Sequence, residues 1–553
     1  MGLIDRRIGL LFGIFLGLLA IAGVRAAYFG AVRSGALKTA ANSQQVSTIT
    51  VPAPRGTISD RNGVELAVSE PASDVSATPY LIKDPLRVAT RIAPLLGQPR
   101  DAVLRKLSQK DTGFVYLART LPDTRARKIE DMQIEGLQFT ASSLRTYPQK
   151  QLASQLLGLV GTEGKGLAGL EYSEDRILSG RNGERRLVKD ALGEPISLQD
   201  DQATKAGHGI RLTIDAAIQD KAEAVLAEVG QAYQPKGATA IVMDPRSGDL
   251  LAVANWPAVD ANHYGEAPTY ARMNRAVGAA YEPGSTFKPF TVAGAMSDNL
   301  VQPDTAFNLA PSIQVADRTI NEAHDRGYET LTTAQILAQS SNVGAVTIGL
   351  RLGASRFDGW VRRFGFGQTT HSDLPGEQSG IVPALKDYSG SSIGNLPIGQ
   401  GLAVTPLQMA TAYAAIANGG VLRPPHVIAA VGGKPVRRPR ARRVLSARVA
   451  ASVRTMLEGV LAAGGTASEV SIPGYQLAGK TGTANKPDPA TGGYSETKYV
   501  ASFVGFAPAA RPRLLVAVMV DEPQGEIFGG AVAAPAFQKI AEFALPYLRI
   551  PPR

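Results

Sequence analysis

An uncharged apolar stretch opens the chain, and a long remainder of mixed pattern follows it. The apolar stretch, Ile8–Val24, has about 17 residues, which is close to the shortest helix that spans a membrane. It continues past Arg25 to Phe29, because an arginine near a helix end can extend its guanidinium to the interface. Two arginines precede the stretch, so the pattern predicts a cytoplasmic tail over 1–7 and a membrane helix over 8–29.

A cleaved signal peptide is the alternative interpretation of this stretch. Val24-Arg25-Ala26 is a poor small-x-small cleavage site, which favours an uncleaved signal-anchor. We therefore expect a single-pass protein of the plasma (inner) membrane, with its N-terminus cytoplasmic and its bulk outside the cytoplasm. The small and polar residues 30–50 predict a stalk.

The next segment, residues 51–205, mixes helical and strand patterns. Near its start, Asp60-Arg-Asn-Gly63 predicts a turn before the strand-like Val64–Val68. A different pattern begins at about residue 206, so we expect a second domain over 206–553.

Apolar and polar residues alternate at the start of the second domain, and Asp215 then predicts the cap of a helix to about Val229. Ala238–Met243 and Leu250–Ala254 predict a hairpin. Helical patterns dominate 286–462. Later strands and a last helix are predicted at Tyr475–Thr483, Ser502–Phe506, Leu514–Val520 and 533–548. Sheet, helices and sheet again predict a mixed α+β or α/β domain.

Composition narrows the chemistry of this chain of 553 residues. It has no cysteine, which excludes thiol nucleophiles and thiolate metal sites, and its five histidines show no metal-ligand spacing. We therefore expect no metal and look for chemistry from Ser, Lys, Asp or Glu. The net charge of +10 suits nucleic acid, an anionic membrane or an anionic wall polymer. The sequence has no arginine-aromatic module of the kind that binds nucleic acid, so we do not expect nucleic acid as a partner.

One basic run stands out, Lys434–Arg443. It predicts a solvated loop before a helix at Leu445–Leu461. Binding of an anionic glycan or lipid headgroup is the alternative.

A serine and a lysine three residues apart lie in the stretch YEPGSTFKPF, after a Pro-Gly turn. If Ser285 opens a helix, Lys288 lies one turn on and on the same face. A neutral Lys288 could accept the Ser285 proton if burial and nearby cations lower its pKa. Alone, such a pair is more often a capped helix start with an exposed lysine. Pro289 is tolerated because it falls in the first turn.

Two later motifs change this balance. Ser340-Ser-Asn342 follows an apolar helical stretch at Leu331–Leu337, and Lys480-Thr-Gly-Thr483 ends a strand. The spacings from Ser285 to Ser340 and on to Lys480 are about 55 and 140 residues. This ordered set is similar to that of penicillin-binding proteins and class A β-lactamases.

Acyl transfer explains why the three motifs need their serine, lysine and asparagine residues. Ser285 would be the nucleophile and Lys288 its base, within hydrogen-bond reach. Ser340 could relay a proton to the leaving amine, and Asn342 could hold the Lys288 amine and the substrate amide. Lys480 would lower the pKa of Lys288 and attract a substrate carboxylate.

The residues after Lys480 suit substrate binding. Thr481 and Thr483 offer hydroxyls to the carboxylate, and Gly482 leaves room for a substrate backbone beside the strand. The backbone N–H groups of Ser285 and Thr483 would hold the oxyanion. Strand alternation sends Lys480 and Thr481 to opposite faces, so the role of Thr481 requires a twist or bulge.

At this point the chain resembles a class B penicillin-binding protein. Arg55–Gly63, Arg145–Pro148 and Gly166–Glu171 resemble blocks of that family's N-terminal module. Further blocks resemble its transpeptidase domain: Leu212–Asp215, Asn274–Val277, Gly399–Pro406, Gly529-Gly530 and Ala534-Pro535.

The resemblance implies a non-enzymatic, dimerisation-type pedestal over 51–205 and a transpeptidase domain with an antiparallel five-stranded sheet flanked by helices. The enzyme would cross-link peptidoglycan stem peptides, drawn from a lipid-linked precursor, through a Ser285 acyl-enzyme that β-lactams trap. No cofactor is implied. Ser340-Ser-Asn342 resembles the division-type (septal) enzymes, whose partners would be a polytopic glycosyltransferase and other division proteins of the membrane.

Other functions remain open within and outside this class. Elongation-type or sporulation-type transpeptidases are the nearest. A β-lactam hydrolase or sensor is disfavoured, because no Glu-x-x-Leu-Asn motif lies between Asn342 and Lys480 and a hydrolase has no use for a pedestal. A catalytically silent scaffold is disfavoured because all three motifs are intact.

Overall fold

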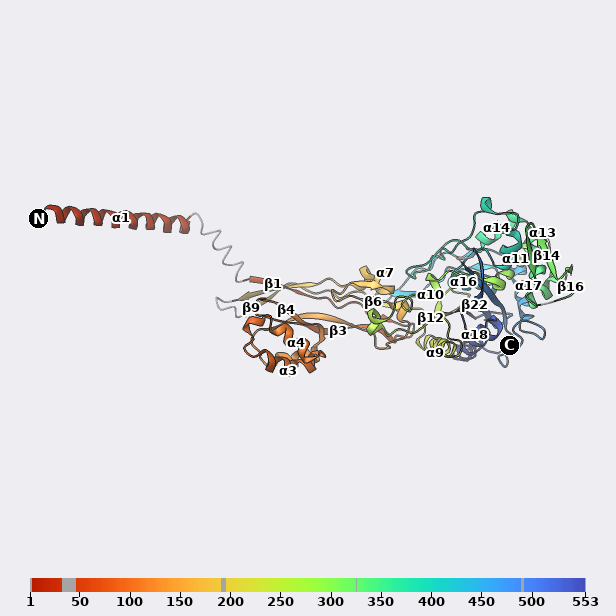
Figure 1. The fold of residues 1–553 in the computed structure, drawn as a ribbon, viewed down its shortest axis with the longest axis horizontal. Helices are drawn as coiled ribbons and strands as arrows, with labels where there is room; N and C mark the ends of the chain where they lie inside the picture. The colour runs from red at the N-terminus through yellow and green to blue at the C-terminus, as the bar shows by residue number, and fades with distance from the viewer. Residues whose placement is uncertain (1, 32–45, 190–194, 325, 489–491, 553) are drawn as a thin grey trace. The chain divides into compact units, whose positions relative to one another are not determined.

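The computed structural model describes residues 2–31, 46–189, 195–324, 326–488 and 492–552 (Figure 1). The chain groups into two compact units that interleave in sequence. The first comprises Met1–Pro54, Pro71–Ser143 and Gly180–Gly207, and the second comprises Arg55–Glu70, Leu144–Ser179 and His208–Arg553. The second unit therefore contains two segments from the predicted pedestal. The functional boundary at residue 206 stays a prediction.

An N-terminal helix, α1 (Gly2–Ala31), covers the predicted membrane segment. Its residues Arg7–Gly30 have a mean hydropathy of 2.2, and across the described ranges this is the one helix long and apolar enough to cross a membrane. The helix fits a single-pass membrane anchor.

In the first unit, β1, β8 and β9 form an antiparallel sheet in the order β1-β8-β9. β3 belongs to a seven-stranded sheet, in which it pairs antiparallel with β4 and also pairs with β5. Helices α3 and α4 pack on each other over a separate apolar core that includes Ile92, Val103 and Leu117. The elements are β1 (Val46–Val51), β3 (Glu65–Ala77, which begins in the second unit), η1 (Pro79–Leu81), α3 (Pro85–Leu96), α4 (Arg100–Leu107), β4 (Val115–Pro122), α5 (Asp123–Glu130), β5 (Leu137–Thr146), β8 (Gly183–Lys189) and β9 (Pro195–Gln202).

Three segments that resemble family blocks meet in the second unit around one buried carboxylate. Glu171 is fully buried and accepts from Arg55 at 2.8 Å and from Arg145 at 2.6 Å. Arg55 also pairs with Asp175 at 2.7 Å. Removing Glu171 would leave Arg145 buried without its carboxylate and Arg55 with Asp175 alone, so this network holds the segments together. The short elements here are β2 (Ile58–Ser59), α6 (Ser154–Leu157), β6 (Leu159–Val160), β7 (Gly166–Ala168), α7 (Gly169–Ser173) and α8 (Asp175–Leu178).

The predicted turn at Asp60–Gly63 is confirmed. The Asp60 carboxylate accepts from the backbone N–H of Asn62 and Val64 at 2.7 and 2.8 Å. It also accepts from Ala216 N at 3.0 Å, beside the predicted cap Asp215. The Asp215 side chain accepts from Ala217 N, so it caps α9 (Ala216–Tyr233), which runs one turn longer than predicted.

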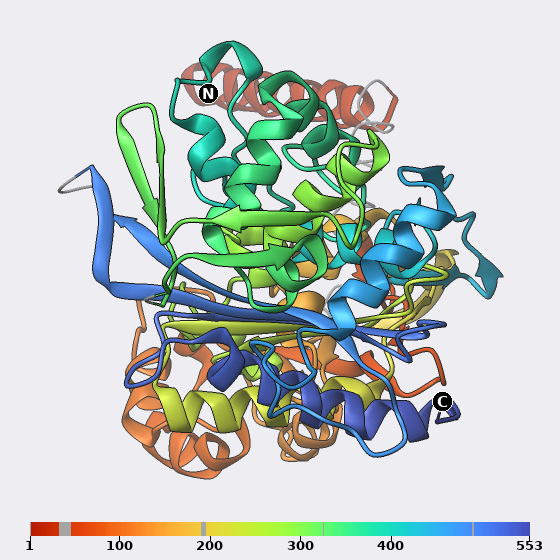
Figure 2. The same ribbon diagram turned by 90° about the vertical axis from the view of Figure 1, so that its right-hand side faces the viewer.

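A five-stranded antiparallel sheet forms the centre of the second unit, as predicted, with the order β12-β11-β23-β22-β21. Every residue of β11 is buried, because helices cover both faces of the sheet. Figure 2 shows the yellow α9 and the dark blue α18 beneath the strands of the central sheet, and the green helices from the region between β12 and β21 above them. The strands are β11 (Gly237–Met243), β12 (Leu250–Trp256), β21 (Ala478–Asp488), β22 (Gly493–Ala507) and β23 (Leu514–Asp521), and the last helix is α18 (Gly529–Tyr547).

Helices dominate the region between β12 and β21, as predicted, but short hairpins interrupt them. Each hairpin strand has two to four residues, too few to show a period in the sequence. The helices are η2 (Ala261–Glu266), α10 (Arg275–Gly278), η3 (Gly284–Phe287), α11 (Lys288–Ser297), α12 (Thr333–Ala338), α13 (Asn342–Leu352), α14 (Ala354–Arg363), η4 (Leu385–Asp387), α15 (Ser392–Asn395), η5 (Leu396–Ile398), α16 (Pro406–Ala417) and α17 (Ala447–Glu458). The other strands are β10 (Ile210–Leu212), β13 (Ala306–Leu309), β14 (Ser312–Val315), β15 (Arg318–Asn321), β16 (Glu329–Thr332), β17 (Val421–Leu422), β18 (Ile428–Val431), β19 (Lys434–Pro435) and β20 (Arg442–Arg443).

Candidate active site

The segment around Ser285 folds as a 3-10 turn, η3, that leads directly into α11. Lys288 is the first residue of α11 and Pro289 falls in its first turn, as predicted. The buried Tyr413 hydroxyl donates to the carbonyl of Thr286 at 2.6 Å. The rings of Phe287 and Phe290 lie 5.4 Å apart in the core beneath. The segment is thus fixed from below by apolar packing.

Lys288 brings the first and second motifs together. Its side chain is fully buried. Its Nζ lies 2.5 Å from the carbonyl oxygen of Ser340, 2.8 Å from Oδ1 of Asn342 and 3.3 Å from Oγ of Ser340. A neutral amine has two N–H groups, which suffice for the two shorter contacts and leave its lone pair free.

Burial lowers the pKa of Lys288 to about 7, because desolvation disfavours the ammonium. Glu322 raises this pKa and Arg326 lowers it, as smaller effects. A large fraction of the Lys288 amine is therefore neutral near pH 7. That is the protonation state that the predicted base requires.

The Ser285 side chain is half-buried. Among the residues that the structure describes, no hydrogen bond joins its hydroxyl to the Lys288 amine. Catalytic hydrogen bonds are often long before substrate binds, so the predicted proton transfer stays a prediction.

Ser340 occupies the turn between α12 and α13 with a φ of 62°. A non-glycine residue in this left-handed region costs about 1–3 kcal/mol, and such strain is concentrated at functional sites. The conformation turns both the carbonyl and the hydroxyl of Ser340 toward Lys288.

Glu322 is the residue that sequence reasoning missed. Its carboxylate accepts from Asn342 N at 2.8 Å, from Val343 N at 3.2 Å and from the Ser341 hydroxyl at 2.5 Å. It therefore holds the start of α13, where an anion also meets the positive end of the helix. Glu322 lies about 20 residues before the motif and carries no local signal of this role.

The third motif lies on β21, an edge strand of the sheet. Lys480 is fully buried. Its pKa lies well below the usual range, mainly because burial disfavours the ammonium and to a smaller extent because Lys288 repels it. Its Nζ lies 3.3 Å from Thr481 Oγ1, and that hydroxyl is 2.6 Å from Thr466 Oγ1. The Lys480 amine and the Thr481 hydroxyl thus meet, although adjacent strand residues point to opposite faces.

Gly482 has a packing role beside the predicted one, which stays a prediction. A Cβ at this position would lie 2.5 Å from Ser502 Oγ and 2.9 Å from Pro283 O. Glycine therefore lets the segment before Ser285 pack directly against β21. Beside it, Thr483 Oγ1 accepts from Gly529 N at 3.0 Å, which joins β21 to the start of α18.

Replacing Glu322 with Gln is expected to shift the pH dependence of Ser285 acylation. Removing this negative charge lowers the pKa of Lys288 further, so the rise of the rate with pH moves to lower pH. The acylation rate constant of a β-lactam, measured from pH 5 to 9, checks this. Glu266→Gln, which removes a charge from an exposed residue of η2, serves as the matched control. An unshifted or upward-shifted profile for Glu322→Gln would contradict the role of Glu322.

Two protein families match the chain. Residues 238–542 match the penicillin binding protein transpeptidase domain, and residues 50–212 match the penicillin-binding protein dimerisation domain. The chain is 34% identical over 545 residues to a probable peptidoglycan D,D-transpeptidase PenA of Neisseria meningitidis, with 98% of this chain and 91% of the relative covered. It is 32% identical over 556 residues to the peptidoglycan D,D-transpeptidase FtsI of Escherichia coli, with 99% and 93% covered.

Solved structures agree with these matches. The crystal structure of penicillin binding protein 3 from Mycobacterium tuberculosis in complex with aztreonam superposes with a TM-score of 0.71 at 30% identity. The match covers 91% of this chain and 98% of that one.

Proposed function

The chain belongs to the penicillin-binding proteins, the peptidoglycan D,D-transpeptidases that join a dimerisation domain to a transpeptidase domain, and we propose that it cross-links stem peptides at the division septum. The observation that supports the site assignment best is the convergence of the second motif on Lys288. The amine is buried, has a pKa lowered to about 7 and is held by Ser340 and Asn342.

In the acylation step, Ser285 Oγ attacks the carbonyl of the penultimate D-Ala, and Lys288 takes the hydroxyl proton. Ser340 relays a proton to the leaving D-Ala amine, and the backbone N–H groups of Ser285 and Thr483 hold the oxyanion. The amine of a neighbouring stem then attacks the acyl-enzyme, which restores Ser285 and forms the cross-link.

Substrate would lie along the outer side of β21, where an edge strand leaves backbone groups unpaired. Lys480, Thr481 and Thr483 present an amine and two hydroxyls on this strand for the substrate carboxylate. The charge of Lys288 contributes to lowering the pKa of Lys480, whereas the pKa of Lys288 itself is lowered by burial and by Arg326.

For the location we propose an uncleaved signal-anchor in the plasma membrane, with the N-terminus cytoplasmic. The domain over 51–205 would contact a polytopic glycosyltransferase and other division proteins. The septal role is supported by the Ser340-Ser-Asn342 motif and by the similarity to FtsI of E. coli. A sporulation-type or elongation-type role is the second candidate.

A fluorescent penicillin is expected to label the full-length protein covalently, with an acyl-enzyme that persists for many minutes. Gel fluorescence after removal of free drug measures that lifetime. Turnover within seconds would instead indicate a β-lactam hydrolase, and no labelling would indicate a scaffold.

A tagged copy imaged in dividing cells should lie at midcell, and a signal along the lateral wall would refute the septal role.

A further inference from the structure

A cavity of about 490 Å³ lies in the second unit, and none of the residues of the three motifs lines it. Arg246 comes from the turn between β11 and β12, and Arg511 and Arg513 come from the turn between β22 and β23. The pairing of Met243 with Leu515 places both turns at the same end of the sheet. Arg454 of α17 completes a set of four arginines.

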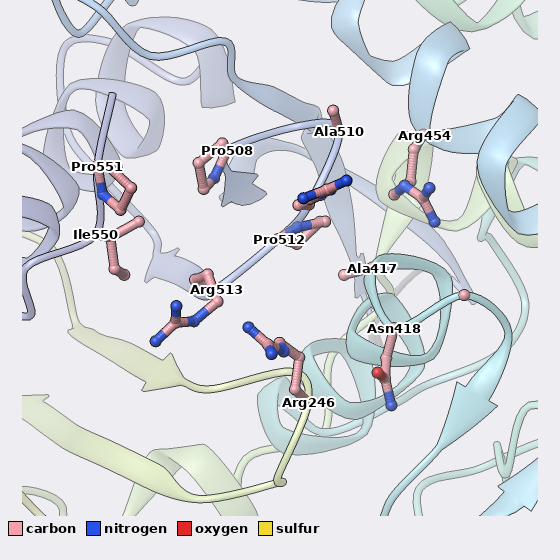
Figure 3. A pocket seen from close by; sticks show the side chains of 12 residues that line it. Arg246, Ala417, Asn418, Arg454, Pro508, Ala510, Pro512, Arg513, Ile550 and Pro551 are labelled. Carbon is pink, nitrogen blue, oxygen red and sulfur yellow. The ribbon is translucent and has the colours of Figure 1, made fainter. Parts of the chain in front are cut away.

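Figure 3 shows the side chains of Arg246 and Arg513 extending into the same space. No acidic residue lines the cavity. Within the part of the chain that the structure describes, none of the four guanidiniums forms a salt bridge. Positive charges gathered without a carboxylate repel one another, and an anion would relieve that repulsion.

Arg454 is the most enclosed of the four. Its Nε is buried without a hydrogen-bond partner in the described residues, and its Nη1 has a long contact of 3.5 Å to the carbonyl of Ile416. Burial lowers the pKa of Arg454, and Glu458, one turn along α17, offsets this without lining the cavity. A buried guanidinium donor without an acceptor suits a ligand that brings one.

The basic run Lys434–Arg443 extends the positive charge from the cavity. Its residues are exposed, as predicted. Arg443 donates to the carbonyl of Gly419, a lining residue, at 2.9 Å. Arg438 pairs with Asp249, the last residue of the β11–β12 turn, at 3.1 Å. One end of the run thus contacts the lining of the cavity directly.

Another part of the cavity lining is apolar and includes Pro508, Ile550 and Pro551 (Figure 3). Guanidinium forks match carboxylates, and proline and isoleucine match an apolar side chain. A bare phosphate polymer would bind the guanidinium groups and leave the apolar wall exposed to water. We propose that this cavity binds an acidic peptide segment of a partner protein, with carboxylates on either side of an apolar side chain.

Fluorescence anisotropy with the full-length protein in detergent tests this site. The probe is a labelled heptapeptide with four Glu residues around a central Leu, and the same peptide with Gln in place of Glu is its neutral control. We expect the acidic peptide to bind, and its Kd to rise by about tenfold or more in Arg511→Gln/Arg513→Gln and in Arg454→Gln. Both variants should still be labelled by penicillin, which shows that they fold.

The matched control is Arg437→Gln/Arg440→Gln, which removes the same charge as the double variant from the neighbouring basic run. It should change the Kd by less than about twofold, because these arginines do not line the cavity. An equal loss in this control, equal binding of the Gln peptide, or no binding of the acidic peptide would overturn the proposal. Binding of labelled inorganic polyphosphate, with no binding of the acidic peptide, would assign the cavity to a phosphate polymer instead.

Discussion

Lys288→Ala is expected to slow acylation of Ser285 by a β-lactam by about 10²–10⁴-fold, the usual contribution of a positioned general base. The substitution removes the amine that Ser340 and Asn342 hold, and it leaves the ring packing of Phe287 and Phe290 unchanged. The rate constant is measured from labelling time courses, and the thermal midpoint reports on the fold.

Lys288→Arg separates charge from basicity. A guanidinium stays protonated at every accessible pH, so it cannot accept the Ser285 proton. We expect this variant to be as slow as Lys288→Ala. Lys539→Ala, at an exposed ion pair with Glu228, is the control and should acylate normally. Near wild-type acylation in Lys288→Ala would show that another group takes the proton.

Ser285→Ala is expected to abolish covalent labelling completely, because no other residue can form the acyl-enzyme. The hydroxyl makes no hydrogen bond in the described residues, so its loss should leave the free energy of unfolding within about 0.5 kcal/mol of wild type. Intact-protein mass spectrometry after treatment with penicillin measures the adduct.

Ser297→Ala is the matched control for this loss. Ser297 is the last residue of α11, and its hydroxyl donates to the carbonyl of Ala293 at 2.7 Å. This variant should carry the adduct at the wild-type level. An adduct on Ser285→Ala would place the nucleophile elsewhere and contradict the site assignment.

The sequence alone determined the features that local rules control. The apolar stretch predicted α1, the Asp215 cap predicted the start of α9, and the turn residues at Asp60–Gly63 predicted their turn. Apolar segments predicted β11, β12 and β23, whose residues are almost all buried. The strand predicted at Tyr475–Thr483 is instead β21, Ala478–Asp488, so the third motif lies near its start rather than at its end. The ordered motifs identified the residue types of the site.

Only the tertiary structure decided how distant segments meet. Glu322 holds the start of α13, and a missing Cβ at Gly482 lets Pro283 approach β21. The four arginines of the cavity come from two turns and a helix that no sequence pattern connects. These contacts depend on chain packing over long separations. Local propensity and periodicity describe a residue's own element, but not the element that will lie against it.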